Sequence, residues 1–380
     1  MALSTEEREE LRSTARGLLA RESSSERVRA AVGEAQGFDR ALWDQMVELG
    51  WTTVHIAEGH GGAGCGYVDL AVILHELGRA ITPSPFLASA VLATGALGLA
   101  DNDALAGPLL ASLAAGESLG AVALASRDGS YDSDRLSTSW ATHGGDSVRL
   151  QGASGFVLDA DLAAVLVVAA RDQHGAIAML AVDAGTPGVH IERTATVDET
   201  RRLFAVTFDD VAVNGDRMLT TPGVPAGVLF QRVLAIGVIA AACDATGTAD
   251  RALELAAEYA KERMQFGKPI GSFQAVKHHC ANMAIAVEAS RAATRGAAES
   301  LDGDPERWSV TASITSSYVG PACSETCALG LRVHGGIGFT WEQDSHLYLK
   351  RAKLDEVLFG TPSWHRRRLA NAVFPSLIAS

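Results

Sequence analysis

One stretch decides how the second half of this chain is organised: Arg263-Met-Gln-Phe-Gly-Lys-Pro-Ile-Gly-Ser-Phe-Gln274-Ala275. It places a cation, an aromatic ring, a Gly-Lys-Pro-Ile break and an amide at fixed offsets, directly after a segment rich in Ala, Glu and Leu. Glycine and proline interrupt regular helices, because glycine loosens the backbone and proline removes a backbone donor. We therefore expect two long helices, 228–261 and 273–301, joined by a short connection.

The chain has three regions that differ in their pattern of apolar and polar residues. Residues 1–118 are mainly helical in pattern, 119–217 carry short β-rich or alternating runs, and 218–380 are helical again. A chain of 380 residues is longer than the chain that usually folds around one hydrophobic core, so several folding units are expected. The sequence predicts an α+β fold with an N-terminal helical domain, a middle antiparallel β-domain and a C-terminal four-helix bundle.

The expected elements are long helices and short strands. Besides the two helices above, helices are expected at 8–21, 39–50, 68–79, 306–333 and 346–358. Strands are expected at 120–124, 147–151, 164–169, 176–182 and 202–208, where Gly, Asp and Pro separate them. Ser4, followed three residues later by Glu7, predicts a capping box that opens the first helix.

Composition argues against several classes of protein. The formal net charge is -13 and no long basic run occurs, which argues against nucleic acid as a partner. No run of 18 uncharged apolar residues occurs, which argues against a membrane span. The N-terminus runs straight into acidic residues and lacks the pattern of a signal peptide. We expect a cytoplasmic protein.

Two further motifs favour structural roles. The five cysteines form no even, closely spaced framework, so reduced thiols are expected. Cys323 and Cys327 would share a helix face, but no His or acid cluster accompanies them, which favours core packing over a metal site. The run Gly59-His-Gly-Gly-Ala-Gly64 lacks the Lys-Ser/Thr of a phosphate loop, so a plain loop is favoured.

Arg263, Phe266 and Gln274 form the first candidate site. A diphosphate favours a fixed, bidentate cation such as arginine. A phenyl ring offers a flat apolar surface, and an amide can both donate and accept. The competing interpretation is an ordinary helix-loop-helix corner with a solvated arginine. The Gly267-Lys-Pro-Ile270 break, in register with Gln274, favours a ligand site over that corner.

A second block, Arg332-Val-His-Gly-Gly-Ile-Gly-Phe-Thr340, lies about 60 residues further on. Gly335 and Gly336 would let the backbone approach a ligand closely or adopt positive φ. The plainer interpretation is a glycine cap that ends the preceding helix, and both can hold at once. His334 by itself is expected to be structural.

With a third block, Leu358-Phe-Gly-Thr361, the order and spacing resemble the flavin-binding half of the acyl-CoA dehydrogenase family. The resemblance covers essentially the whole chain. It implies α,β-dehydrogenation of an acyl-CoA thioester with FAD, and an electron-transfer flavoprotein as acceptor. It also implies a set of FAD-binding residues, which are Arg263, Phe266, Gln274, Arg332, Gly335, Gly336 and Thr361. In the family, the members of this set that precede position 340 reach across a dimer interface to the neighbour's FAD. Arg332 stands where relatives often carry Gln.

The resemblance fails at the catalytic base. In the family a carboxylate removes the acyl α-proton while flavin N5 takes the β-hydride, so the base must be an anionic side chain. Most members carry that Glu directly before a Gly-Thr pair, where this chain has Phe359. A minority carry it on the first long helix of the bundle, where this chain has Gln231. Glu356 or Asp355 could share a helix face with Phe359, but a solvated or ion-paired acid is the plainer interpretation.

The β-region also departs from the family pattern. Relatives that cradle the flavin ring carry a Thr-Glu-Pro…Gly-Ser-Asp segment, where this chain reads Ala123-Leu-Ala-Ser-Arg-Asp-Gly-Ser130. They also carry an aromatic-Ile-Thr-Asn-Gly turn whose Thr contacts the ring, and Leu158 replaces that Thr here. The half of the site that a chain gives to its neighbour is largely kept, and the half that it would use itself is not.

Three hypotheses follow. The chain is a base-less subunit that completes the FAD site of a homologous partner, as in α2β2 enzymes resembling the heterotetrameric steroid side-chain acyl-CoA dehydrogenases. Alternatively, it is a self-sufficient homotetramer with a displaced base such as Glu356. The third hypothesis is a non-enzymatic homologue that binds acyl-CoA or serves as a scaffold. No catalytic residue and no metal ligand is assigned.

Overall fold

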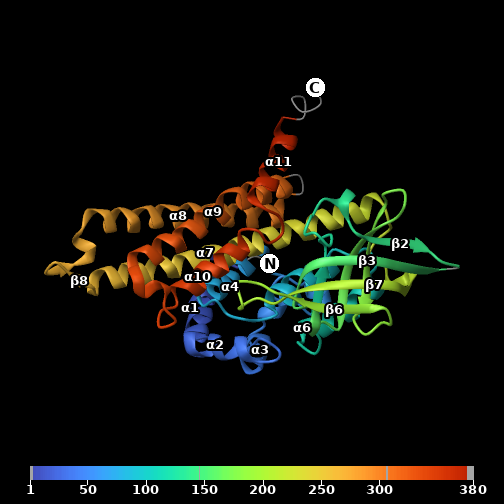
Figure 1. The fold of residues 1–380 in the computed structure, drawn as a ribbon. Coiled ribbons are helices and arrows are strands. Elements are labelled where there is room, and N and C mark those ends of the chain that lie inside the picture. The colour runs from blue at the N-terminus through green and yellow to red at the C-terminus, as the bar shows by residue number, and fades with distance from the viewer. Residues whose placement is uncertain (1–2, 145, 305–306, 375–380) are drawn as a thin grey trace. The chain divides into compact units, whose positions relative to one another are not determined.

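The computed structural model describes residues 3–144, 146–304 and 307–374. The chain divides into two compact units (Figure 1). The β unit consists of Gly33–Gly66 and Pro83–Gly237, and the helical unit of Leu3–Val32, Tyr67–Thr82 and the chain from Val238 onward. N-terminal helices thus belong to the same unit as the C-terminal ones. The expected boundaries at 118 and 217 stay a prediction.

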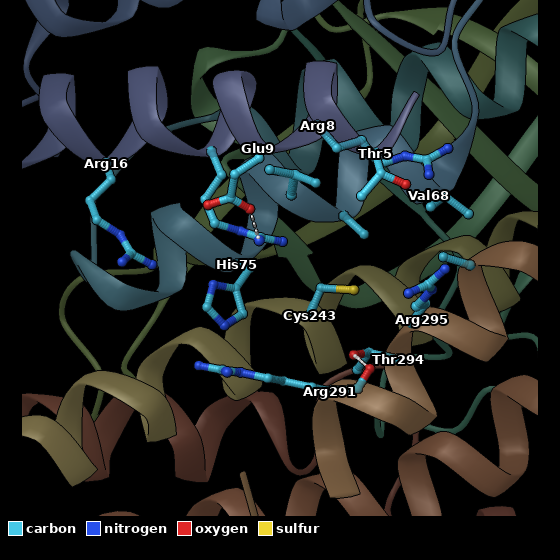
Figure 2. A pocket seen from close by; sticks show the side chains of 14 residues that line it. Thr5, Arg8, Glu9, Arg16, Val68, His75, Cys243, Arg291, Thr294 and Arg295 are labelled. Atoms are coloured by element: carbon cyan, nitrogen blue, oxygen red, sulfur yellow. Dashed lines mark hydrogen bonds and ion pairs between the residues drawn. The ribbon is translucent and has the colours of Figure 1, made fainter. Parts of the chain in front are cut away.

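The helical unit is built from helices that come from both ends of the chain. They are α1 (Thr5–Glu22), α2 (Ser25–Gly33), α4 (Tyr67–Arg79), most of α7 (Val224–Glu262), α8 (Gln274–Gly303), α9 (Trp308–His334), α10 (Ser345–Asp355) and α11 (Pro362–Val373). The capping box at the start of α1 is present, because Ser4 Oγ accepts from Glu7 N–H and the Glu7 carboxylate accepts from Ser4 N–H. Side chains of α1, α4, α7 and α8 border a cavity in this unit (Figure 2).

Small side chains pack the four helices α7 to α10. α7 presents alanines at three- and four-residue spacing, which are Ala245, Ala249, Ala252, Ala256 and Ala260. Cys323 and Cys327 of α9 lie in the same core, and burial raises the pKa of Cys323 to about 12. Such thiols stay protonated and pack as small apolar groups. Among the described residues, no group of three or more His, Cys, Asp or Glu is placed to hold a metal.

α4 and α7 cross at two glycines. A Cβ atom on Gly78 would lie 2.0 Å from the Asp244 carbonyl oxygen, and one on Gly247 would lie 1.9 Å from the His75 carbonyl oxygen. The two backbones are therefore in direct contact, and Thr248 Oγ1 donates to the Gly78 carbonyl oxygen at 3.1 Å. This crossing fixes an N-terminal helix to the C-terminal bundle.

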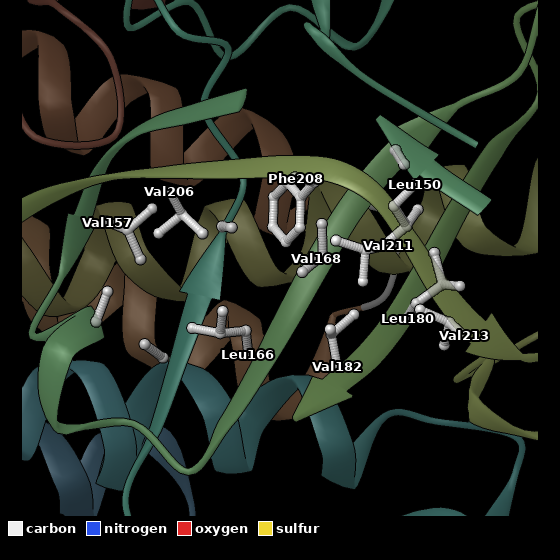
Figure 3. Close-up of a cluster of buried hydrophobic side chains, with 14 of the residues drawn as sticks. Leu150, Val157, Leu166, Val168, Leu180, Val182, Val206, Phe208, Val211 and Val213 are labelled. Atoms are coloured by element: carbon white, nitrogen blue, oxygen red, sulfur yellow. The ribbon is translucent and has the colours of Figure 1, made fainter. Parts of the chain in front are cut away.

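The β unit contains a seven-stranded sheet with the order β1-β4-β2-β3-β7-β6, in which β5 also pairs with β4. The strands are β1 (Gly120–Ala123), β2 (Thr138–Thr142), β3 (Ser147–Leu158), β4 (Val165–Arg171), β5 (Ile177–Asp183), β6 (Val189–Thr194) and β7 (Leu203–Asn214). Figure 3 shows the core on this sheet, where Val, Leu and Phe208 side chains from several strands meet. The unit also holds α3 (Arg40–Glu48), α5 (Thr94–Gly98), α6 (Asp103–Ala114) and a buried π-helix, Phe86–Ala93.

The predicted fold class is confirmed, with one correction: the sheet is mixed rather than purely antiparallel. β1 pairs with β4 in parallel, from Gly120 opposite Val165 to Ala123 opposite Val168. β2 also forms a parallel bridge to β4. All of β1 and nearly all of β4 are buried, so both strands are continuous apolar runs of the kind that parallel pairing tolerates. The pattern of each strand alone does not reveal the direction of its partner.

Other expected elements are present with small shifts in their bounds, and some elements were not expected. The helices and strands without a counterpart in the sequence expectations are α2, α5, α6, α11, the π-helix, β2, β6, and the two short strands β8 (Met264–Gln265) and β9 (Lys268–Pro269). The start of the helix expected at 306–333 lies outside the described residues. β3 runs on to Leu158, beyond the expected end at 151, because a β-bulge near Gly152 carries the strand past that glycine.

The glycine run 59–64 forms a closed turn. The N–H groups of Gly61, Gly62 and Gly64 donate to the carbonyl oxygens of Glu58, Ala57 and Ile56. A Cβ on Gly62 would lie 2.0 Å from the Ile56 carbonyl oxygen. Because these donors are used within the turn, the geometry agrees with a plain loop and not with a phosphate cradle.

α7 is the one described helix long and apolar enough to cross a membrane by length and composition. Its most apolar window has a mean hydropathy of 1.9, and 78% of that window is buried within the protein. A buried helix of this kind is typical of the core of a globular protein.

We expect Gly247→Ala to lower the free energy of unfolding by about 3 kcal/mol, because the new methyl group forces α4 away from α7. Urea unfolding of the full chain measures this. Gly296→Ala is the matched control, since Gly296 is an exposed glycine of α8 with no atom within 4 Å of an added Cβ. The control should stabilise the chain by about 1 kcal/mol. Equal effects of the two changes would contradict the close crossing.

Candidate functional site

The stretch 263–274 forms a small hairpin between α7 and α8. β8 (Met264–Gln265) pairs with β9 (Lys268–Pro269), and Ile270 N–H donates to the Arg263 carbonyl oxygen at 2.8 Å. Phe266 and Gly267 form its two-residue tip, at the end of the two helices (Figure 1). The connection expected from the sequence is therefore an ordered projection.

Phe266 is held in a strained and exposed conformation at this tip. Its φ is 52° and that of Gly267 is 78°, which is the geometry of a type I′ turn, favoured by Asn-Gly. A left-handed phenylalanine costs of order 1 kcal/mol or more. The side chain is 91% exposed, and its ring meets the Phe273 ring edge-on with centroids 6.0 Å apart. An exposed, strained aromatic ring is better explained by a ligand or partner than by folding.

Arg263 and the N-terminus of α8 together offer a site for an anion. Within the part of the chain that the structure describes, the exposed Arg263 guanidinium has no ion pair or hydrogen bond. α8 begins at Gln274, and its N-cap residue, Phe273, makes no side-chain capping bond. The first N–H groups of a 30-residue helix and a guanidinium fit the diphosphate of a dinucleotide.

The glycine block lies at the same end of the helical unit. Gly335 caps α9 with a φ of 67°, and nothing lies within 4 Å of a Cβ built on Gly335 or Gly336. His334 Nδ1 lies 2.8 Å from the Gly330 carbonyl oxygen, and its ring stacks on Tyr259 with centroids 4.7 Å apart. The Tyr259 carbonyl oxygen in turn accepts from Arg263 N–H at 2.9 Å. His334 thus ties the glycine block to the base of the hairpin, a structural role.

Arg332 and Gln274 are both exposed at this end. Arg332 Nη1 lies 3.6 Å from Glu325 Oε1, in a surface ion pair that costs little to break. The structure therefore brings six of the predicted cofactor residues to one end: Arg263, Phe266, Gln274, Arg332, Gly335 and Gly336. The N-terminal N–H groups of α8 are a further candidate contact, which residue types alone do not reveal.

The third block is built differently. Phe359 is buried, with a φ of 64°, and its carbonyl oxygen lies 3.2 Å from His365 Nε2. Thr361 is the N-cap of α11, where its hydroxyl accepts from Trp364 N–H at 3.2 Å. The residue before Gly360-Thr361 is thus a buried phenylalanine in a fixed conformation, and its side chain cannot take a proton.

α9 separates the third block from the other two. Gly320 of α9 packs against Glu356, because a Cβ on Gly320 would lie 3.1 Å from the Glu356 Cα. His334, at the glycine block, ends the same helix. The ~14 intervening residues correspond to about 21 Å along the helix axis. Thr361 is therefore not placed with the other predicted residues of the same chain.

Glu356 is already engaged. Its Oε2 accepts from Ser324 Oγ at 2.6 Å and from Lys353 Nζ at 2.9 Å. These two bonds hold the carboxylate against α9 and α10. This geometry is that of an ion-paired helix carboxylate.

One segment of the β unit stands where relatives cradle the flavin ring. Its backbone N–H donors are bonded to oxygens of the same unit. The N–H groups of Ser126, Gly129 and Gly155 donate to the carbonyl oxygens of Ser130, Ser126 and Ser126. Arg127 N–H donates to Ser137 Oγ at 2.6 Å. The Phe156 ring covers Gly129, and Leu158 is 4% exposed. These residues do not fit the polar edge of a flavin ring, whereas the hairpin end fits a diphosphate.

Comparison with known proteins gives matches over nearly the whole chain. The family models Acyl-CoA dehydrogenase, N-terminal domain, and Acyl-CoA dehydrogenase, C-terminal domain, match residues 5–117 and 228–374. Acyl-CoA dehydrogenase IpdE2 of Mycobacterium tuberculosis is 33% identical, over 98% of this chain and 98% of its own. A solved variant of the Tcur3481-Tcur3483 steroid ACAD is 29% identical, with a TM-score of 0.89 over 99% of both chains. The ChsE4-ChsE5 complex from M. tuberculosis is 27% identical, with a TM-score of 0.87 over 98% of this chain and 99% of its own.

We expect Phe266→Asn to leave the free energy of unfolding unchanged or to raise it by up to about 1 kcal/mol, because Asn-Gly suits the turn. Urea unfolding measures this. A loss of more than about 1 kcal/mol would show that Phe266 is needed for folding and would remove the argument from strain.

We expect acid to destabilise the chain through His365. Burial lowers the pKa of His365 from 6.5 to about 4, so the folded state favours the neutral ring. The unfolded state binds the proton first, and stability falls as the pH drops from 6.5 towards 4, by up to about 1.4 kcal/mol per pH unit. Urea unfolding across this range should show a shallower pH dependence for His365→Gln than for the native chain. Parallel curves would contradict this assignment.

Proposed function

This chain belongs to the acyl-CoA dehydrogenase family, and we propose that it is a base-less subunit that completes the FAD site of a homologous partner subunit. Family membership confirms the resemblance inferred from the motifs and FAD as the cofactor. The division of labour between two subunits is the proposal.

The free, exposed anion site at the hairpin carries the proposal. Arg263, the first residue of α8 and the Gly335-Gly336 backbone are all exposed, and Phe266 is almost fully exposed as well. An exposed site suits a cofactor that is bound mainly by another chain. If the chain bound the cofactor mainly by itself, we would expect these residues to be buried.

The state of the base positions supports the same conclusion. Phe359 and Gln231 carry no group that accepts a proton at neutral pH. Glu356, the strongest replacement, is bound to Ser324 and Lys353. The β-unit segment around Leu158 is closed on itself. The self-sufficient homotetramer would need all three of these features to rearrange.

When bound, FAD accepts the hydride in the oxidation of an acyl-CoA thioester to the enoyl thioester. In this proposal Arg263 would hold the FAD diphosphate. The amide of Gln274 and the Gly335-Gly336 backbone would position the nucleotide, and Phe266 would shield it from water. Proton removal and the flavin ring belong to the partner subunit.

The partner is proposed to be a homologous chain in an α2β2 tetramer. Two of the similar solved proteins carry paired names, Tcur3481-Tcur3483 and ChsE4-ChsE5, and the first is called a steroid ACAD. We extend this to a bulky acyl-CoA substrate, an electron-transfer flavoprotein as acceptor and a cytoplasmic location. The family assignment is compatible with each of these.

We expect Arg263→Ala to strip FAD from the co-purified two-subunit complex. Removing a charge-assisted bidentate contact costs about 1.5–3 kcal/mol, which weakens FAD binding by about tenfold or more. Absorbance at 450 nm per complex measures the retained flavin. Arg307→Ala is the control, since Arg307 is an exposed arginine that faces Asp304 at 3.8 Å.

Three outcomes separate the hypotheses. Colourless protein when the chain is purified alone, together with flavin that depends on Arg263 in the complex, supports the proposal. One flavin per chain and dye reduction with acyl-CoA in the isolated chain would instead support the homotetramer. Flavin retained in the Arg263→Ala complex would overturn the role given to the hairpin.

A further inference from the structure

The helical unit contains a cavity whose charges the proposed flavin site does not use. The cavity measures about 450 Å³ and lies between α1, α4, α7 and α8, with five arginines in its lining (Figure 2). They are Arg8, Arg12 and Arg16 of α1 and Arg291 and Arg295 of α8. The volume is within the range of small-molecule sites. Arg291 lies about 17 residues from the start of α8, or ~25 Å along the helix, so the cavity is separate from the hairpin.

The arginines are arranged against the ordinary preferences of a helix. Arg8, Arg12 and Arg16 follow one another at four-residue spacing, as do Arg291 and Arg295. Like charges at this spacing repel each other and destabilise a helix. The two rows converge in a protein whose net charge is -13. A row of apolar residues would serve packing better.

Buried carboxylates orient three of the guanidinium groups. Arg8 Nε donates to Asp69 Oδ1 at 2.7 Å, and Arg16 donates to Glu76 from both Nε and Nη2 at 2.9 Å. Arg291 Nη2 lies 2.6 Å from Asp250 Oδ1. Asp69 and Glu76 are 0% and 1% exposed, so they lie behind the lining. Each guanidinium has five N–H donors, and these contacts use one or two.

The nearest partners of the other two arginines are exposed, and the buried Glu76 carboxylate, which lies 4.0 Å from Arg12 Nε, is also held by Arg16. Arg12 Nη1 lies 2.7 Å from Glu9, and Arg295 Nε lies 2.9 Å from Glu299. Surface pairs of this kind contribute little and are readily exchanged for a ligand. The lining itself holds five arginines and one carboxylate, Glu9, whereas the other carboxylates that pair with these arginines lie outside the lining. It therefore suits an anion that offers several oxygens to several guanidinium groups.

One wall of the cavity is apolar. Val68, Ala71 and Val72 of α4 lie at three- and four-residue spacing, and Ala298 of α8 lines the same space. An inorganic anion would leave this wall in contact with water. A ligand with a flat apolar body and a multiply charged end would contact both kinds of surface.

We propose that this cavity binds a nucleotide polyphosphate, with the phosphates on the arginines of α1 and α8 and the base against the α4 wall. Arginine binds phosphate through paired, planar N–H donors, which suits five guanidinium groups on two facing helices. The site is independent of the proposed FAD contacts and does not require the chain to be a subunit.

The test uses the full chain with ATP and with inorganic pyrophosphate, each titrated without metal by isothermal calorimetry. The test variant is Arg12→Gln/Arg295→Gln, because these two side chains can be removed without leaving a buried carboxylate unpaired. Saturable one-to-one ATP binding is expected, weakened about tenfold or more in the variant. Arg40→Gln is the control, since Arg40 forms a similar exposed pair with Asp44 at 2.8 Å. The control should change ATP affinity less than about twofold.

Arg263→Ala should leave ATP affinity unchanged, which separates this site from the flavin site. Each single variant is titrated as well, so that a folding defect in the double variant does not hide the result. Absence of saturable ATP binding, or equal binding by the double variant, would overturn the proposal. Loss of ATP binding in Arg263→Ala would assign the ligand to the hairpin and would also overturn it. Pyrophosphate that binds as tightly as ATP would overturn the nucleotide class.

Discussion

The rigid length of α9 is the constraint on which the functional architecture depends. The glycine block ends this helix, while Phe359 and Glu356 pack beside its middle, about 21 Å away along the axis. A helix does not shorten to bring such groups together. One copy of the chain therefore holds the predicted site residues apart, in two half-sites. This spacing supports the proposal that a second chain completes the site, and the missing base is the reason to propose a homologous partner instead of a second copy.

Backbone strain is distributed unevenly between the two half-sites. Phe266 and Phe359 both adopt positive φ, one almost fully exposed and the other buried. Burial against its neighbours and the contact with His365 hold Phe359 in place, so its strain is offset inside the fold. The exposed Phe266 meets the edge of the Phe273 ring, and 91% of its side chain remains open to solvent. Strain that the fold does not offset marks a position where a ligand or another chain contributes the stabilising contact.

The N-terminal helices join the C-terminal bundle through backbone contact and charge. Gly78 and Gly247 let α4 and α7 touch. Close beside them, the carboxylates of α4 and α7 hold the arginines of α1 and α8. This junction creates an arginine-lined cavity in a unit whose buried clusters are apolar. The same charges therefore have two effects: they connect segments distant in sequence, and they leave guanidinium donors directed at a shared space.

The sequence alone determined the fold class, the long helices, most strands and the family, because these depend on local pattern and on residue type at fixed spacing. The FAD-binding role of the motif around Arg263 stays a prediction. The sequence did not determine the parallel pairing of β1 with β4, since an apolar run reads the same in either direction. Only the tertiary structure separated Thr361 from the hairpin, engaged Glu356 with Ser324, and gathered arginines nearly 300 positions apart around one cavity. Those outcomes depend on which helix faces meet, and no local stretch of sequence contains that information.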